Sequence, residues 1–168
     1  DKQTIVMDLQ GRLWLMSSSG GEAKAITDPF GDARQPAWSP DGGQITFQGY
    51  WEGNWHIYTV DKEGRNLQQW TQGIFDHREP QYSPDGQHIV FSSDRDGTYD
   101  IWSINLQTKV LKQLTQDIGN EYAPCWSASG NRIAFVSDKP DKEGIYYYSQ
   151  KEKSSKLVCR TTGSTWGL

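Results

Sequence analysis

Cysteine, methionine and histidine are scarce in this 168-residue sequence, which contains two, two and three of them. Two cysteines cannot build a framework of several disulfides, and no two histidines stand at a spacing that makes a zinc pair. No apolar run is long enough for a transmembrane helix, and no charged-then-apolar leader opens the sequence at Asp1. The net charge is -4 and there is no basic stripe, so neither nucleic acid binding nor membrane insertion is predicted.

Aromatic residues and glycine, in contrast, are abundant. Eight Trp, eight Tyr and 17 Gly favour short strands and tight turns over helices. A chain of 168 residues is about the length of one domain and can bury one sizeable core. The composition therefore predicts a single all-β domain over residues 1–168, and it carries no information on function.

A tandem repeat of 44 residues is the main signal in the sequence. The segments 35–42, 79–86 and 123–130 each contain a proline, an aromatic residue two positions later, then serine, and end in glycine. A register that is kept through many positions indicates tandem structural units. The same period relates Phe47, Phe91 and Phe135; Ile57, Ile101 and Ile145; and Thr27, Thr71 and Thr115.

Within each unit, short apolar runs alternate with turn signals. Ser-Pro-Asp-Gly at residues 39–42 and 83–86 is typical of a type I turn whose glycine is left-handed and closes a bulged hairpin. Residues 127–130 keep only the glycine, so this turn is predicted to be similar but looser. Four strands in 44 residues match one blade of a β-propeller. The predicted units are residues 1–31, which are incomplete, 32–75, 76–119 and 120–168.

The repeat runs through Leu-Thr, a short loop, Pro-x-Trp-Ser-Pro-Asp-Gly and Ile-x-Phe-x-Ser-Asp-x-Asp-Gly. This succession resembles the TolB-type propeller repeat, which is related in shape to WD-repeat propellers. This repeat occurs in TolB, in the tricorn protease, and in propellers attached to prolyl-oligopeptidase-like peptidases and to amidohydrolases. The resemblance implies that residues 35–39, 79–83 and 123–127 form the innermost strands, which line a channel. It also implies a location outside the cytoplasm, such as the periplasm.

The number of repeats is small for a closed ring. The sequence holds about 3.8 units, whereas propellers usually have about four to eight blades. We therefore expect a segment of about four blades from a larger propeller, with open blade faces that favour self-association. The alternative is that residues 164–167, which include Trp166, supply the missing innermost strand of the first unit.

Charged and polar residues precede or begin the innermost strands at equivalent positions in three units. The resemblance places them at the mouth of the channel, where carboxylates and arginines are suited to bind a metal ion or a peptide terminus. Asp32 and Asp76 are weak metal candidates, and no cofactor is otherwise predicted. The alternative is that each Asp caps its own loop and pairs with a neighbouring Arg. The channel-mouth candidates are Asp32, Arg34, Asp76, His77, Arg78, Asn120, Glu121 and Tyr122.

Three further aromatic residues, Tyr50, Trp51 and Trp55, lie in and beside a turn flanked by glycines. Large rings in such a turn are predicted to be exposed, so these three are candidates for a contact surface. Aromatic residues that recur with the repeat are instead predicted to pack between blades. They are Trp38, Tyr82 and Trp126 at one position, and Trp14, Tyr58, Trp102 and Tyr146 at another.

The cysteines and one acidic turn are interpreted as structural. Cys125 is predicted on an innermost strand and Cys159 on the outermost strand of the same unit, about 14 Å apart at about 4.8 Å per strand. That separation is too large for a disulfide, and both thiols are expected to be buried or half-buried. Residues 94–97 lack the downstream pattern of a calcium loop and are predicted to form a turn.

Together these features favour a non-catalytic module that recognises or scaffolds a protein or peptide through its channel mouth or blade edges. No serine stands in a nucleophile-elbow context that would complete a triad with a histidine. The alternative is the propeller portion of a hydrolase, an amidohydrolase or a peptidase, in which it gates or positions substrate. The two hypotheses differ in the motifs that the parent gene encodes outside this sequence.

Overall fold

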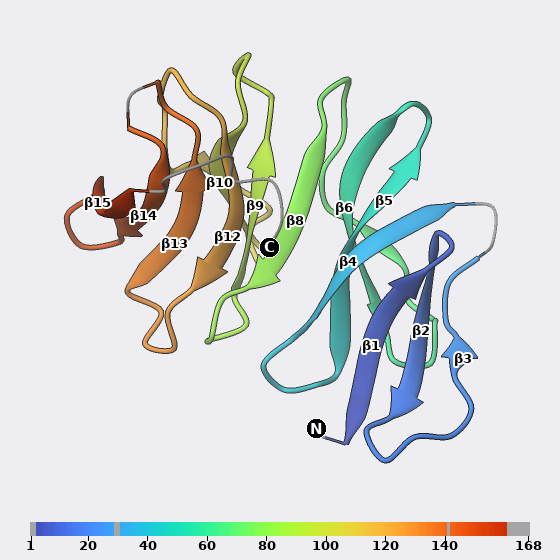
Figure 1. Cartoon of the computed structure of the whole chain (residues 1–168). Helices are drawn as coiled ribbons and strands as arrows, with labels where there is room; N and C mark the ends of the chain where they lie inside the picture. The colour runs from blue at the N-terminus through green and yellow to red at the C-terminus, as the bar shows by residue number, and fades with distance from the viewer. Residues whose placement is uncertain (1–2, 29–30, 141, 161–168) are drawn as a thin grey trace.

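The computed structural model describes residues 3–28, 31–140 and 142–160 of the chain. All regular elements within these residues are β-strands, and they form four antiparallel sheets that lie side by side in chain order (Figure 1). The predicted all-β fold class is therefore confirmed. None of the described residues forms a helix with the length and apolar character that crossing a membrane requires. Trp166 and the strand predicted around it lie outside the described residues.

Each sheet is a meander in which consecutive strands are hydrogen-bonded neighbours. The strands are β1 (Thr4–Leu9), β2 (Arg12–Ser17) and β3 (Lys24–Ala25); β4 (Asp32–Trp38), β5 (Gln44–Trp51), β6 (Asn54–Asp61) and β7 (Gln68–Gln69); β8 (His77–Tyr82), β9 (His88–Ser93), β10 (Asp100–Asn105) and β11 (Leu111–Gln113); and β12 (Glu121–Trp126), β13 (Arg132–Ser137), β14 (Gly144–Ser149) and β15 (Ser154–Arg160). Strand β8 contacts both β4 and β12, so the strands that the resemblance makes innermost lie together.

The hairpin turn between the first two strands of each four-stranded sheet has the predicted geometry. Gly42 and Gly86 have φ of +70° and +69°, and each amide donates to the carbonyl of the serine three residues earlier at 2.9 Å. Gly130 has the same φ of +70° and the same hydrogen-bond length, so the expectation of a looser turn there is wrong. The reason is that Asn131 Oδ1 accepts the hydroxyl of Ser127, as the Asp carboxylate accepts the serine hydroxyl in the other turns.

Replacing Gly86 with valine is expected to lower the free energy of unfolding by about 1–3 kcal/mol, because a β-branched residue is strained at positive φ. A Cβ at this position would lie 3.8 Å from Pro40 Cδ, an ordinary contact, so the cost arises from the backbone and not from a clash. Urea unfolding measures the change. Gly43, whose φ is not left-handed, is the control, and an equal cost for Gly43→Val would contradict this explanation.

A β-bulge interrupts each innermost strand at the residue before its proline. Gln35, Glu79 and Ala123 have φ of 50°, 57° and 50°, and the pairing register shifts across each of them. The Glu79 amide donates to Gln48 Oε1 of the preceding sheet at 2.8 Å. The Ala123 amide donates at 2.6 Å to Glu79 Oε2, which also accepts the Ser92 hydroxyl at 3.0 Å. Side chains of one sheet thus satisfy the backbone of the next and fix the spacing of the innermost strands.

The hydrophobic core is formed where neighbouring sheets pack on each other. Phe47, Phe91 and Phe135, one from the second strand of each four-stranded sheet, are at most 1% exposed. Tyr82 of β8 belongs to the same buried cluster as Ile57 of the preceding sheet, which confirms packing between blades at this position. This packing holds the sheets in sequence and therefore brings together the loops at their strand ends.

Candidate functional site

The residues that begin each innermost strand alternate between inward and outward positions, because successive side chains of a strand point to opposite faces. Ala33, His77 and Glu121 are equivalent in the repeat, and each is at most 1% exposed. His77 and Glu121 are therefore buried and do not lie at a channel mouth, which corrects the prediction for both. The other channel-mouth candidates, Asp32, Arg34, Asp76, Arg78, Asn120 and Tyr122, are half-buried or exposed.

Each Asp in these segments pairs with the Arg two residues later. Arg34 donates two hydrogen bonds of 2.9 and 2.8 Å to Asp32, and Arg78 Nη2 donates to Asp76 Oδ2 at 2.5 Å. Asp76 Oδ1 also accepts the amide of Trp55 at 2.9 Å. Burial raises the pKa of Asp76, but the hydrogen bonds from Trp55 and Arg78 outweigh it and hold the pKa below its usual range. This is the capping and pairing arrangement that the sequence left open as the alternative.

Two arginines share one indole ring at this end of the strands. The guanidinium carbons of Arg34 and Arg78 lie 5.5 and 5.9 Å from the ring centroid of Trp55. The guanidinium of Arg78 also lies 5.6 Å from the ring of Tyr99. All three distances are within the range of cation–π attraction. The two arginine side chains are nevertheless 53% and 41% exposed, so both remain accessible to a ligand.

Tyrosines extend this cluster on both sides. The ring centroid of Tyr50 lies 5.3 Å from that of Trp55, and the centroids of Tyr99 and Tyr122 are 5.8 Å apart. Tyr50 is 44% exposed and Trp55 is half-buried. We call this set the arginine–aromatic surface. It spans three sheets and consists of Arg34, Tyr50, Trp55, Arg78, Tyr99 and Tyr122.

Trp51 has a structural position instead. Its ring centroid lies 4.9 Å from that of Tyr58, and it packs against the buried cluster of the first two sheets. A Cβ on Gly31 or Gly49 would lie 2.1 Å from the Trp51 ring, so both glycines make room for it. The prediction that Trp51 is an exposed ring is wrong, because β5 continues through this residue and its ring lies back over its own sheet.

Two isoleucines are strongly exposed in the loops that lead into β8 and β12. Ile74 is 82% exposed and Ile118 is 80% exposed. The Ile74 carbonyl accepts Asn54 Nδ2 at 3.2 Å, which places this loop beside Trp55. Exposed apolar side chains next to aromatic and cationic groups are typical of interfaces. Sequence reasoning missed both, although their separation of 44 residues was a usable signal.

The buried His77 and Glu121 belong to the packing between sheets. Burial lowers the pKa of His77 to about 4, and the ring of His56, with its centroid 5.6 Å away, adds to this effect. Burial raises the pKa of Glu121 to about 7, although the Lys139 ammonium lies 3.6 Å from Glu121 Oε1 and opposes the rise. Within the described part of the chain, no three His, Cys, Asp or Glu side chains are grouped to hold a metal ion.

The cysteines lie on the predicted strands, Cys125 on β12 and Cys159 on β15, and both are free thiols. Both are exposed, which corrects the expectation of burial. Cys125 lines a hollow of about 260 Å³ between β4, β8 and β12. The acidic segment 94–97 is the predicted turn, since the Gly97 amide donates to the Asp94 carbonyl at 2.9 Å with φ of +102°.

Meandering sheets packed along β4, β8 and β12 define a segment of a β-propeller, and its loops present cations, aromatic rings and apolar side chains at one end of these strands. A comparison with protein-family models agrees with this class. The model described as the TolB beta propeller domain matches residues 7–106 and 78–165. The chain belongs to this family.

Solved structures share the fold. The putative TolB from Agrobacterium tumefaciens is 25% identical with a TM-score of 0.80, over 87% of this chain and 55% of that one. TolB from Acinetobacter baumannii is also 25% identical with a TM-score of 0.80, over 95% and 41%. A puromycin-hydrolyzing peptidase from Mycobacterium tuberculosis, 13% identical with a TM-score of 0.73 over 98% and 32%, shares the fold alone. The chain thus spans about half the length of the TolB structures. No curated protein matched the sequence.

Proposed function

We propose that this propeller segment is a non-catalytic recognition module that binds a protein or peptide through the arginine–aromatic surface. The observation that carries the proposal is that Arg34 and Arg78 share the Trp55 ring while their guanidinium groups stay accessible. Trp, Tyr and Arg are the residues that most often dominate the binding energy of protein interfaces. Because carboxylates and rings already orient both arginines, little side-chain entropy is lost when a ligand binds.

The chemistry of the surface supports a partner segment that carries carboxylates beside apolar side chains. Guanidinium groups recognise carboxylates through paired, charge-assisted hydrogen bonds. Ile74 and Ile118, exposed in neighbouring loops, offer apolar contacts to the same partner. Such a mixed surface, with rings and cations at the centre and apolar side chains beside them, matches the composition of protein interfaces.

Selection of a random peptide library against the 168-residue chain tests this proposal. We expect enriched peptides to contain acidic and apolar residues, and the double change Arg34→Ala and Arg78→Ala to weaken their binding about 100-fold. Calorimetric titration of the strongest peptide measures the effect. Arg65→Ala is the matched control, because Arg65 is also exposed and paired with carboxylates, but in a different turn.

The proposal fails if no peptide is selected, or if the selected peptides bind the double variant as tightly as the unchanged chain. It also fails if Arg65→Ala weakens binding to the same extent, since the effect would then follow net charge and not this surface. A thermal melt of each variant ensures that the comparison is made between folded proteins.

The alternative function, the propeller portion of a hydrolase that gates or positions substrate, concerns sequence outside this chain. A peptidase would add a Gly-x-Ser-x-Gly elbow, and a metallohydrolase a His-x-His motif. Determining the complete reading frame of the parent gene separates the two proposals. A reading frame with either motif favours the hydrolase, and one without them favours a recognition module.

We also propose that copies of this chain associate with one another. The first and last sheets carry exposed apolar side chains, among them Leu9 at 57% and Val158 at 60%, which supports contacts between copies. Light scattering over a concentration series tests for a dimer, and a constant monomer mass rejects it.

The family resemblance supports a location of the parent protein outside the cytoplasm, which is part of the proposal. A compartment-specific reporter fusion to the parent protein tests this location.

A further inference from the structure

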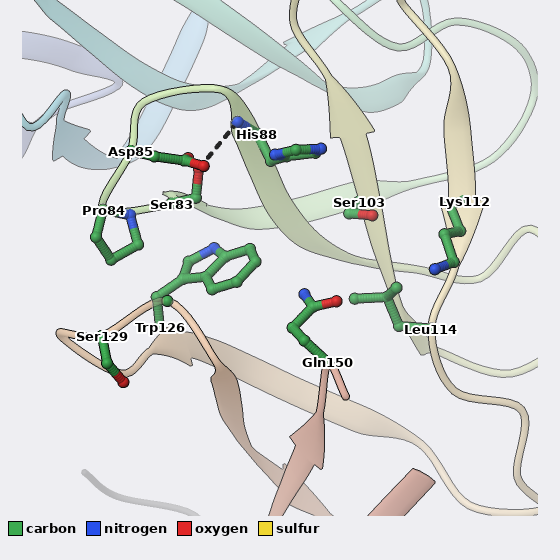
Figure 2. Close-up of a pocket in the computed structure, with 11 residues that line it drawn as sticks. Ser83, Pro84, Asp85, His88, Ser103, Lys112, Leu114, Trp126, Ser129 and Gln150 are labelled. Carbon is green, nitrogen blue, oxygen red and sulfur yellow. Dashed lines mark hydrogen bonds between the residues drawn. The ribbon is translucent and has the colours of Figure 1, made fainter. Parts of the chain in front are cut away.

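A pocket of about 590 Å³ lies between the third and fourth sheets, where β8 ends, whereas Arg78 lies where β8 begins (Figure 2). Trp126 at the end of β12, Leu114 after β11 and Gln150 after β14 line it. Its volume is within the range of small-molecule sites. The pocket is therefore separate from the arginine–aromatic surface.

The repeat provides an internal comparison for this pocket. The equivalent pocket between the second and third sheets has a volume of only about 230 Å³. There Tyr82 stands at the position of Trp126, and its hydroxyl donates to Gln44 Oε1 at 3.3 Å. Leu106 stands at the position of Gln150. The protein's own side chains thus narrow this pocket and provide a hydrogen-bond acceptor for its tyrosine hydroxyl.

The larger volume has a cause in the sequence. Trp70 of the second sheet stands 44 residues before Leu114, and its indole Nε1 donates to Thr59 Oγ1 at 2.9 Å. Ser103 takes the position of Thr59 in the third sheet and lines the pocket together with Leu114. Leu114 leaves open the space that an indole occupies one repeat earlier. The third sheet therefore has room for a bicyclic aromatic ring.

Hydrogen-bond donors and a cation surround this space. Lys112 takes the position of Gln68, and among the described residues no carboxylate forms an ion pair with it. The indole N–H of Trp126 also has no hydrogen-bond partner in the described ranges. Figure 2 shows the side chains of Lys112 and Gln150 on the same side of the pocket as Leu114, facing the Trp126 ring. The lining includes one carboxylate, Asp85, which accepts the Ser83 hydroxyl and the Gln87 amide. Figure 2 shows Asp85 beside Ser83 and away from Lys112. A carboxylate partner for Lys112 is therefore the group that this side of the pocket lacks.

We propose that this pocket binds a small aromatic carboxylate of about the size of an indole. The ring lies between Trp126 and Leu114, in the position that the Trp70 indole takes one repeat earlier, and gains apolar and aromatic contacts. The carboxylate faces the ammonium of Lys112 and the amide of Gln150. This inference does not depend on the recognition function, because the two sites lie at opposite ends of β8.

Indole-3-carboxylate is the probe, and calorimetric titration of the 168-residue chain measures its affinity. We expect a Kd below about 1 mM and a shift of the Trp126 indole N–H resonance in a proton–nitrogen correlation spectrum, assigned with Trp126→Phe. Lys112→Gln restores the residue of the second sheet and is expected to weaken binding about tenfold. Indole without the carboxylate is expected to bind about tenfold more weakly than the probe for the same reason.

Leu114→Trp is the matched control, because it restores the ring that fills the equivalent space in the second sheet. This variant is expected to keep or raise the melting temperature and to lose binding by at least about 100-fold. Leu114→Phe serves the same purpose if the larger ring does not fit. Undiminished binding to a folded variant of either kind, or no binding of the probe to the unchanged chain, would overturn the proposal. Equal binding of indole and the probe would overturn the assignment of a carboxylate.

Discussion

Replacing Phe91 with alanine is expected to lower the free energy of unfolding by about 3–5 kcal/mol, because it removes a buried ring and leaves a cavity. Phe91 is fully buried, and its cluster joins Ile57 of the second sheet to Ile89 and Ile104 of the third. Its ring also makes an edge-to-face contact with the His77 ring, with the centroids 5.5 Å apart. The change therefore weakens the third sheet and its contact with the second at once. Urea unfolding followed by circular dichroism measures the loss.

Two further variants keep this prediction testable. Ile74→Ala removes a side chain that is 82% exposed, so a change of no more than about 0.5 kcal/mol is expected. Phe91→Leu keeps most of the side-chain volume and is expected to lower the free energy of unfolding by about 1 kcal/mol. Even this loss is sizeable, because the free energy of unfolding of a whole domain is only about 5–15 kcal/mol. Similar losses for Phe91→Ala and Ile74→Ala would show that burial between the sheets is not what stabilises the fold.

Features that depend on a few consecutive residues could be predicted from the sequence. The left-handed glycines at positions 42 and 86 follow from the Ser-Pro-Asp-Gly turn, whose geometry is local. Position 130 shows the limit of this reasoning. There the prediction considered the missing Asp and not Asn131, which lies two residues further along and accepts the serine hydroxyl. The repeat itself was visible because a propeller places equivalent residues in equivalent surroundings.

The candidate site could be predicted only in part, because it depends on which face of a strand each side chain occupies. Arg34 and Arg78 were identified, but Trp55 was assigned to a separate surface, and only the packing of two sheets brings the three together. The buried positions of His77 and Glu121 were missed for a different reason. Their polarity suggested a surface, whereas Ala33, which is equivalent in the repeat, was the signal for an inward-facing position.

Glu121 is expected to make the stability of the fold depend on pH between about 4.5 and 7. Burial raises the pKa of this carboxyl from 4.5 to about 7; Asp100 and Asp117 add to the rise, and Lys139 opposes it. A raised carboxyl pKa means that the folded state favours the protonated form. Its contribution to stability is therefore complete below pH 4.5 and is lost as the pH rises through 7. At about 1.4 kcal/mol per pKa unit, this contribution amounts to about 3 kcal/mol.

His77 is expected to change the stability of the fold in the opposite direction over a similar range of pH. Burial lowers the pKa of this imidazole to about 4, so the folded state favours the neutral form. Its contribution is complete above pH 6.5 and is lost as the pH falls toward 4. The two effects oppose each other in the unchanged chain, where burial also lowers the pKa of His56 and raises the pKa of Asp100. The pH profile of the unchanged chain therefore isolates neither contribution. Removing one of the two groups is therefore needed to observe the other.

Glu121→Gln separates them, because the amide occupies nearly the same volume and does not titrate. Relative to the unchanged chain, the variant is expected to gain about 3 kcal/mol in the free energy of unfolding between pH 4.5 and pH 8. The contribution of His77 cancels from this difference, and unfolding in urea at both pH values measures it. Glu63→Gln is the matched variant, because it makes the same chemical change at an exposed carboxylate. A difference between Glu121→Gln and the unchanged chain that is the same at both pH values would mean that the buried carboxyl stays ionised, held by Lys139 more strongly than burial opposes it.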